Sequence, residues 1–144
     1  MPNRPIREIV RNQRIVTVPR TASIRTAAHM MKESRIGALA VVDGERLVGI
    51  FTERDALFRV LAGRLDPDRT TVDEVMTHDP TTIGPERSIM HALHLMHDGG
   101  FRHLPVVERG RPVGMVSIRD AVGPELVRFE HEVHDKEAIA EILA

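Results

Sequence analysis

The heptapeptide GIFTERD, which spans Gly49–Asp55, returns 65 positions later as GMVSIRD, which spans Gly114–Asp120. Both segments contain a glycine, two apolar residues, a hydroxyl residue, two further residues and an aspartate. The repetition extends outward from them, because Thr17–Ala56 aligns with Thr82–Ala121 without a gap and 15 of the 40 aligned pairs are identical. The chain is therefore a tandem duplication, and this duplication constrains its architecture more than any local pattern does.

Each copy predicts the same order of elements, beginning with a short β-rich stretch and a helix. The expected ranges are 15–18 and 24–34 in the first copy and 80–83 and 89–98 in the second. Ser23 and Ser88 precede the helices and are typical N-caps. Two strands follow, joined by turn residues at Asp43–Gly44 and Arg109–Gly110. A second helix is expected to begin at the repeated segment, so each copy has the order β-α-β-β-α.

One such unit would leave a face of its sheet uncovered, so the two copies are expected to pack face to face. The predicted fold class is α/β, in the α+β sense, with two tandem β-α-β-β-α repeats and an additional C-terminal helix. The expected ranges are 8–62 for repeat 1, 63–74 for a linker, 75–122 for repeat 2 and 123–144 for the helical extension.

The C-terminal extension carries apolar residues at alternating steps of three and four, the spacing of a short heptad seam interrupted by one lysine. The seam consists of Leu126, Phe129, Val133, Lys136, Ala140 and Leu143. Such a seam can pack on its own domain or against a second subunit, and the sequence does not favour either arrangement.

The composition narrows the class of protein. The 144 residues have a formal net charge of -1 and contain no cysteine, which excludes disulfides and thiolate chemistry. Tryptophan and tyrosine are absent, so an aromatic platform that stacks nucleic-acid bases is not expected. The basic start of the chain lacks the apolar core of a secretory signal, and no apolar run has the length of a membrane span. A soluble cytoplasmic protein is expected.

The repeated segment allows two interpretations. In the structural one, Thr52 or Ser117 caps the following helix, and the aspartate three residues later lies where a carboxylate favours the helix N-terminus. In the functional one, free amides at the helix start and the hydroxyl would donate to a phosphate. The carboxylate of Asp55 or Asp120 would then accept hydrogen bonds from a ribose diol.

Several residues near the repeated segment support the functional interpretation. Gly49 and Gly114 allow backbone to approach closely where a side chain would obstruct it. Arginine can bind phosphate with two parallel hydrogen bonds. The basic residues near the two segments are Arg54, Arg102, His103 and Arg119. A nucleotide fits this combination better than a bare phosphate, which the aspartate would repel.

The two copies resemble a tandem pair of cystathionine β-synthase (CBS) domains, the Bateman module. The resemblance lies in MMKESRIGALAVVDGERLVGIFTERD, LMHDGGFRHLPVVERGRPVGMVSIRD and VMTHDPTTI, and it covers residues from about 8 to 122. It implies a pseudo-twofold disc with two clefts between the sheets. Modules of this family commonly bind AMP, ADP or ATP, and some bind S-adenosylmethionine or NAD.

The resemblance further implies that each cleft uses residues of both copies. In the first, named here the Asp55 cleft, Thr52 and Asp55 would hold phosphate and ribose, with Arg54 nearby. Thr77 and residues 101–105, which include His103, would surround the base.

In the second, named here the Asp120 cleft, Ser117 and Asp120 would hold phosphate and ribose, and Arg102 and Arg119 would supply positive charge. Residues 36–40, with Gly37 and Ala38, would surround the base. Two features depart from the family pattern. Asn12 and Ala40 replace the second copy's Thr77 and Pro105 around the base of the Asp120 cleft. The Asp55 cleft lacks a basic residue at Gly37, the counterpart of Arg102.

The resulting hypothesis is a regulatory sensor of an adenosine-containing molecule, with no chemistry of its own, no metal, and no role for nucleic acid or membrane. The chain contains no further enzyme or transporter domain, so a protein target in trans is expected. A homodimer is expected because the discs of this family commonly pair through helices.

Four alternatives remain open. His91, His94 and His97 are spaced by three on a helix and could share a metal, although this face is expected to be mostly solvated. The arginines within residues 4–14 could contact nucleic acid. A set of Ser117, His103 and Asp120 could act as nucleophile, base and orienter, although no G-x-S-x-G segment is present. A protein-interaction module with empty clefts is the fourth.

Overall fold

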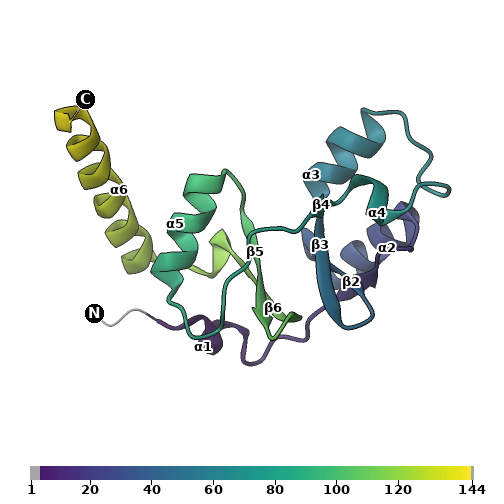
Figure 1. Ribbon diagram of the computed structural model, residues 1–144, viewed down its shortest axis with the longest axis horizontal. Coiled ribbons are helices and arrows are strands. Elements are labelled where there is room, and N and C mark those ends of the chain that lie inside the picture. The colour runs from purple at the N-terminus through teal and green to yellow at the C-terminus, as the bar shows by residue number, and fades with distance from the viewer. Residues whose placement is uncertain (1–3, 144) are drawn as a thin grey trace.

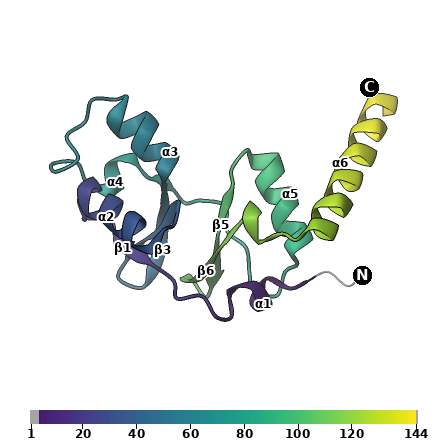
Figure 2. The same cartoon turned by 180° about the vertical axis from the view of Figure 1, so that it is seen from behind.

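The computed structural model describes residues 4–143 and shows a mixed α+β chain with two tandem repeats and a C-terminal helix, which confirms the predicted fold class (Figures 1 and 2). Repeat 1 and its linker contain α1 (Ile6–Val10), β1 (Thr17–Pro19), α2 (Ile24–Ser34), β2 (Ala38–Asp43), β3 (Arg46–Thr52), α3 (Glu53–Asp55), η1 (Ala56–Leu61) and α4 (Val72–Val75). The remaining elements are β4 (Thr77–His78), α5 (Ile89–Gly99), β5 (His103–Glu108), β6 (Arg111–Ser117), η2 (Ile118–Asp120) and α6 (Gly123–Leu143).

The helices α2 and α5 form where the duplication predicts them. Ser23 accepts a hydrogen bond from Thr26 N, and Ser88 accepts one from His91 N, so both expected N-caps are confirmed. Each helix buries one apolar face against its repeat. The buried residues are Ile24, Ala27 and Met31 in α2 and Ile89, Met90, Ala92, Leu93 and Met96 in α5.

The two repeats differ in the extent of their sheets. Repeat 1 contains the strand order β1-β2-β3-β4, whereas β5 and β6 form a two-stranded hairpin in repeat 2. The strand expected at 80–83 is reduced to one parallel bridge between Ile83 and Val106. Gly84 and Pro85 follow Ile83, and neither residue type sustains a strand interior.

The short helices α1 and α4 are exchanged between the repeats. Ile6 and Val10 of α1 belong to the hydrophobic core of repeat 2. Val72 and Val75 of α4 belong to the core of repeat 1. The predicted linker 63–74 therefore contributes side chains to the first core, and the predicted domain boundaries at 62 and 75 stay predictions.

Backbone hydrogen bonds hold the exchanged segments in both repeats. They include those from Ile6 N to Arg87 O (2.7 Å), from Ile89 N to Arg4 O (2.8 Å), from Val72 N to Ala22 O (2.8 Å) and from Ile24 N to Thr70 O (3.0 Å). Positions 87 and 89 are the duplicates of 22 and 24. The pseudo-twofold relation between the repeats therefore includes the segments that they exchange.

The glycine of the repeated segment makes room for this exchange. A Cβ added at Gly49 would lie 2.9 Å from Thr77 O, and one at Gly114 would lie 2.6 Å from Val10 Cβ. Both distances are shorter than a real Cβ tolerates. The expected close approach of backbone is confirmed at Gly49, whereas at Gly114 the side chains of Val10 and Gln13 make the approach.

The second copy lacks the helix that was expected at its repeated segment. After Thr52 the chain forms α3 and continues into the π-helix η1, whereas after Ser117 it forms the single 3-10 turn η2. Ala121 then adopts an extended conformation with ψ 134°. The chain then begins a new helix at Gly123, and Pro124 lies in its first turn, where proline is tolerated because no backbone N–H is needed.

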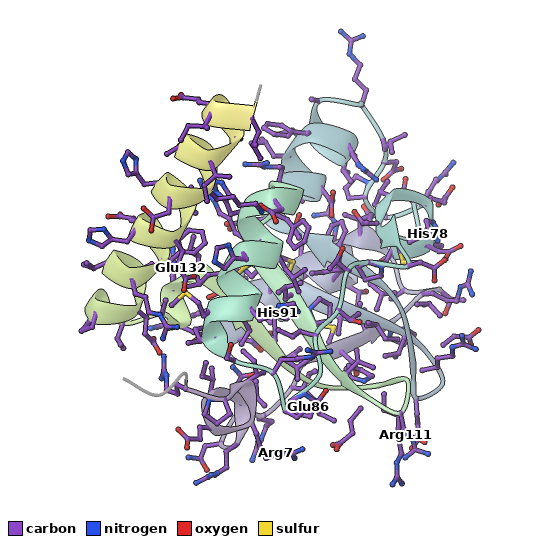
Figure 3. The ribbon with its side chains drawn as sticks, turned by 60° about the vertical axis from the view of Figure 1, so that its left-hand side comes forward. Arg7, His78, Glu86, His91, Arg111 and Glu132 are labelled. Atoms are coloured by element: carbon purple, nitrogen blue, oxygen red, sulfur yellow. The ribbon has the colours of Figure 1, made fainter. Side chains whose placement is uncertain are left out.

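The new helix, α6, packs beside α5 through its first half (Figure 1). Figure 3 labels Glu132, whose Oε2 lies 2.6 Å from His94 Nε2 of α5. The Phe129 ring contacts the His94 ring edge-on, with centroids 4.9 Å apart. At the other end of the helix, Ile142 is 81% exposed and Leu143 is 79% exposed. The seam therefore packs on its own domain in its first half, and its second half leaves apolar side chains uncovered.

The exchange predicts that a mutation near the N-terminus destabilises the distant second repeat. Ile6→Ala should lower the free energy of unfolding by about 3 kcal/mol in urea denaturation, because it removes buried apolar atoms and leaves a cavity. Hydrogen exchange should accelerate first in α5, β5 and β6. Leu65→Ala is the control, because Leu65 is 41% exposed in a loop. Acceleration confined to β1–β3 would contradict the exchange.

Candidate functional site

The repeated segment forms a capping box in both copies, as its structural interpretation predicts. In the first copy, Asp55 Oδ2 accepts from Thr52 N at 2.9 Å, and Thr52 Oγ1 accepts from Asp55 N at 3.2 Å. In the second, Asp120 Oδ2 accepts from Ser117 N at 2.7 Å. Asp55 is only 8% exposed. One carboxylate oxygen of each aspartate is thus committed to the fold.

These helix starts do not offer the free amides that the functional interpretation expects. Besides the Thr52 and Asp55 amides, Glu53 N donates to Gly37 O at 3.0 Å, so three of the four amides from Thr52 to Asp55 have partners. In the second copy, Ile118 N donates to Arg102 O at 3.1 Å. The corner therefore offers fewer free amides than expected, because it hydrogen-bonds the residue before β2 in the first copy and before β5 in the second. Positive side chains must supply most of any phosphate site.

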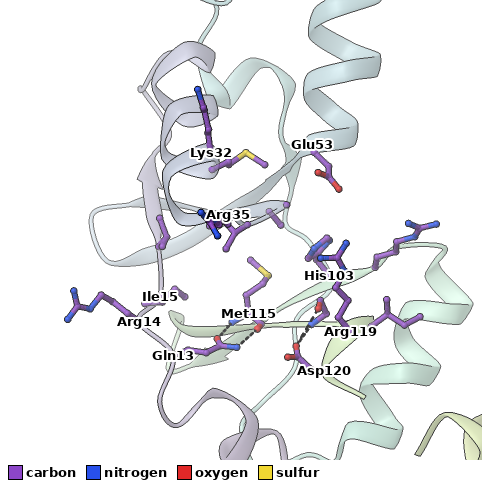
Figure 4. Close-up of a pocket in the computed structure, with 18 of the residues that line it drawn as sticks. Gln13, Arg14, Ile15, Lys32, Arg35, Glu53, His103, Met115, Arg119 and Asp120 are labelled. Atoms are coloured by element: carbon purple, nitrogen blue, oxygen red, sulfur yellow. Dashed lines mark hydrogen bonds between the residues drawn. The ribbon is translucent and has the colours of Figure 1, made fainter. Parts of the chain in front are cut away.

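The Asp120 cleft has a volume of about 860 Å³ and is shown in Figure 4. The predicted site residues that line it are Gly37, Ala38, Arg102, His103, Ser117, Arg119 and Asp120. The end of β6 and the 3-10 turn form one wall. The C-terminal end of α2 and the start of β2 form the opposite wall, with Arg35 and Lys32.

The Asp55 cleft has a volume of about 740 Å³, and the duplication relates it to the Asp120 cleft. The predicted site residues that line it are Thr52, Arg54, Asp55, Thr77, Arg102 and His103. Apolar side chains of η1 and the α5–β5 connection complete it, with Leu57, Phe58 and Phe101 among them. The predicted residues named for the two clefts therefore each line one cleft or both, and their roles in binding stay predictions. Of the ranges 36–40 and 101–105 expected around the bases, Leu39, Ala40, Leu104 and Pro105 are buried and line neither cleft.

Three side chains, Glu53, Arg102 and His103, line both clefts. Arg102 and His103 follow from the family resemblance, but Glu53 was missed. Its duplicate is Ile118, so the comparison of the two copies gives no signal for it. Only its place between Thr52 and Asp55 in the repeated segment indicates that it faces the same space.

The edge of β6 is completed by a side chain rather than by a strand. Gln13 Nε2 donates to Met115 O at 2.9 Å, and Met115 N donates to Gln13 Oε1 at 2.9 Å. In repeat 1 the equivalent edge pairs with β4, where Thr77 lies opposite Ile50. Gln13, and not the expected counterpart Asn12, therefore lines the Asp120 cleft. A side-chain amide that replaces a strand leaves no pattern in the sequence.

Burial lowers the pKa of His103 below its ordinary value, and this desolvation is the largest contribution. Glu53 and Asp120 act in the opposite direction, whereas Arg119 and Arg102 lower the pKa further. The imidazole thus favours the neutral form, which can donate one hydrogen bond and accept another. An anion bound beside it would favour its protonation.

The alternative sites do not gain support from the geometry. Ser117 bonds to Asp120 directly, and within residues 4–143 no side-chain hydrogen bond joins Ser117 to His103, so the three lack the order of a nucleophile relay. His94 is bound to Glu132. In the described part of the chain, no three histidine, aspartate or glutamate side chains are placed to share a metal ion. None of its helices has the length and apolarity needed to cross a membrane.

Comparison with known proteins matches both repeats to one family. The CBS domain family model matches residues 6–62 and 72–123. The CBS domain-containing protein CBSCBSPB1 of Arabidopsis thaliana is 36% identical over 132 residues, which cover 91% of this chain and 24% of that protein. The match to another Arabidopsis relative, CBSCBSPB3, covers 18% of the length of that protein. The chain thus spans about a quarter or less of the length of these relatives.

Two solved structures share the fold. A putative signal-transduction protein with CBS domains from Burkholderia ambifaria has a TM-score of 0.75 and 34% identity, with 81% of this chain and 89% of that chain covered. The CBS domain protein PAE2072 from Pyrobaculum aerophilum, complexed with AMP, has a TM-score of 0.79 and 28% identity, with 88% and 98% covered.

The lowered pKa of His103 predicts a pH dependence of stability. The unfolded chain binds a proton near the ordinary histidine pKa of about 6.5, at a higher pH than the folded chain does. The contribution of His103 to stability is therefore complete above this pH and falls below it. His103→Gln should reduce the loss of unfolding free energy between about pH 7.5 and about pH 5.5 in urea denaturation. The exposed His91→Gln is the control, and an equal effect of both variants would contradict the prediction.

Proposed function

The chain belongs to the CBS domain family as a tandem pair, and on that premise we propose that it binds an adenine nucleotide in at least one of its two clefts. CBS domain pairs are regulatory modules. One observation carries the proposal: each cleft places the hydroxyl–carboxylate corner of one repeat opposite the strand start of the other. The AMP complex of the similar Pyrobaculum aerophilum protein supports the choice of ligand.

The proposed binding mode follows from what each group has left to offer. Asp55 and Asp120 use Oδ2 for the cap, so Asp120 keeps Oδ1 to accept hydrogen bonds from a ribose diol. Asp55 Oδ1 lies 3.6 Å from Arg59 Nε, and a diol bound there would share this oxygen with Arg59. Carbonyl and amide groups at the opposite strand start, Gly37–Ala38 or Arg102–His103, would hydrogen-bond the edge of the base. Arginine side chains at the cleft would bind phosphate, which they match with two parallel hydrogen bonds.

The proposal includes a regulated partner. AMP, ADP and ATP are the primary candidates, and S-adenosylmethionine and NAD share the adenosine that the corner would hold. Binding would change the packing between repeats and so alter the activity of a protein that acts in trans, without catalysis by this chain. The expected cytoplasmic location stays a prediction.

Calorimetric titration with AMP, ADP, ATP, NAD and S-adenosylmethionine tests the proposal on the parent protein, Asp55→Asn and Asp120→Asn. Saturable binding of at least one ligand is expected, weakened about tenfold or more by the substitution in the occupied cleft, because a charged acceptor is lost. Glu74→Gln is the matched control, since Glu74 forms a capping box with Thr71 and lines neither cleft.

Three outcomes separate the explanations. Weakening by one aspartate variant but not by Glu74→Gln identifies the occupied cleft. Equal weakening by all three variants attributes the effect to lost helix caps and removes the support for a carboxylate–ribose contact. If no ligand binds the folded parent protein at millimolar concentration, the proposal is wrong.

A second candidate function, an interaction module, is favoured by uncovered apolar side chains on η1 and α6. Leu61 is 72% exposed and Ile142 is 81% exposed. Because such side chains mark association surfaces when they gather, we propose a homodimer formed through these helices. Sedimentation equilibrium should give a dimer for the parent protein and a monomer for Leu61→Glu with Ile142→Glu. The loop variant Leu65→Glu should remain dimeric, and a monomeric parent protein would contradict the homodimer.

A further inference from the structure

The two clefts differ in charge although the duplication relates them. The Asp120 cleft is lined by five arginine and lysine side chains and two carboxylates. The Asp55 cleft is lined by three of each. The cations of the first are Arg14, Lys32, Arg35, Arg102 and Arg119. The Asp120 cleft therefore has a surplus of positive charge, and the Asp55 cleft has none.

The cations also differ in what already binds them. In the Asp55 cleft, Arg59 lies 3.6 Å from Asp55 Oδ1 and donates to Val75 O at 2.9 Å. Arg54 lies over the Phe58 ring, 5.9 Å from its centroid. In the Asp120 cleft, by contrast, none of the five cationic side chains has an ion pair or hydrogen bond within residues 4–143. These charges are available to a ligand.

The backbone at Arg35 gives an independent indication. Arg35 follows α2 in the left-handed conformation, with φ 54°. Its duplicate at the end of α5 is Gly100, with φ 72°. Glycine adopts this conformation without strain, whereas an arginine there is strained. The end of α2 therefore places a cation at the Asp120 cleft where its duplicate has a glycine.

We propose that the Asp120 cleft selects a nucleoside di- or triphosphate, and that Lys32 and Arg35 bind the phosphates beyond the first. The inference rests on the proposed nucleotide function and adds the ligand class of each cleft. Figure 4 shows Lys32 and Arg35 across the cleft from Arg119 and Asp120, so an anion between the two walls meets cations on both sides.

The Asp55 cleft takes a ligand of low charge, a nucleoside or nucleoside monophosphate. Its balanced charges leave no surplus of positive charge to compensate additional phosphates, and an uncompensated charge in a partly buried site is unfavourable. Leu57 and Phe58 are 51% and 60% exposed at this cleft and offer apolar surface to a planar base. The chemistry of the two clefts thus separates ligands by phosphate number.

The test compares two double variants that each remove two positive charges. Lys32→Gln with Arg35→Gln alters the Asp120 cleft. Arg64→Gln with Arg109→Gln is the matched control, because both arginines have positive φ and line neither cleft. ATP, AMP and inorganic tripolyphosphate are titrated against both variants and the parent protein at low and high salt. We expect the first variant to weaken ATP about tenfold and AMP less than about twofold, and the control to change neither by more than about twofold.

The outcomes distinguish this inference from the function on which it rests. Equal weakening of ATP and AMP, or unchanged ATP binding, overturns it while nucleotide binding stands. Loss of ATP binding in Asp55→Asn but not in Asp120→Asn would assign the triphosphate to the Asp55 cleft. This result would also overturn the inference. If no adenine nucleotide binds, tripolyphosphate decides alone. Tripolyphosphate binding that is weakened in the Lys32/Arg35 variant supports a polyanion cleft. If tripolyphosphate does not bind, the inference is overturned.

Discussion

Neither repeat can complete its hydrophobic core without a helix supplied by the other. Ile6 and Val72 are each 0% exposed, and each lies in the core of the repeat to which its own segment does not belong. Their burial removes apolar surface from water only when the two repeats are in contact, so the contact is favoured by the same free energy as folding. The walls of both clefts come from both repeats, and the exchange therefore also sets the distance across each cleft.

The parts of the chain that repeat and the parts that do not have different roles. The repeated glycine, hydroxyl and aspartate build the corner, admit the exchanged segment and occupy most of the amides and one carboxylate oxygen. The positions that could distinguish ligands are those where the copies differ. These pairs are Lys32/His97, Arg35/Gly100, Gly37/Arg102 and Glu53/Ile118. The duplication supplies a scaffold with two clefts, and divergence between the copies supplies their chemistry.

This division explains what could be predicted from the sequence. Hairpins, caps and the helices α2 and α5 rest on local patterns. The family resemblance identified polar residues that line the clefts, but it also included buried strand residues such as Ala40 and Pro105, which line neither. The exchange was missed because α1 and α4 have five and four residues, too few to show which core their apolar side chains enter. The single turn after Ser117 was missed because the duplication predicted a helix there, as in the first copy. The strand-like role of Gln13 had no local signal.

The wall shared by Glu53, Arg102 and His103 makes the two clefts electrostatically dependent on each other. A phosphate that engages Arg102 from one side would withdraw that cation from the other side, which lowers affinity there. The same phosphate would favour a proton on His103, whose charge then faces both clefts. These effects oppose each other, and their balance depends on pH because only His103 changes charge near neutrality. Since coupling between two binding sites is reciprocal, a ligand of the Asp55 cleft would alter affinity in the Asp120 cleft by the same factor. The wall formed by Glu53, Arg102 and His103 therefore couples any ligands of the two clefts, and the sign of this coupling depends on the protonation of His103.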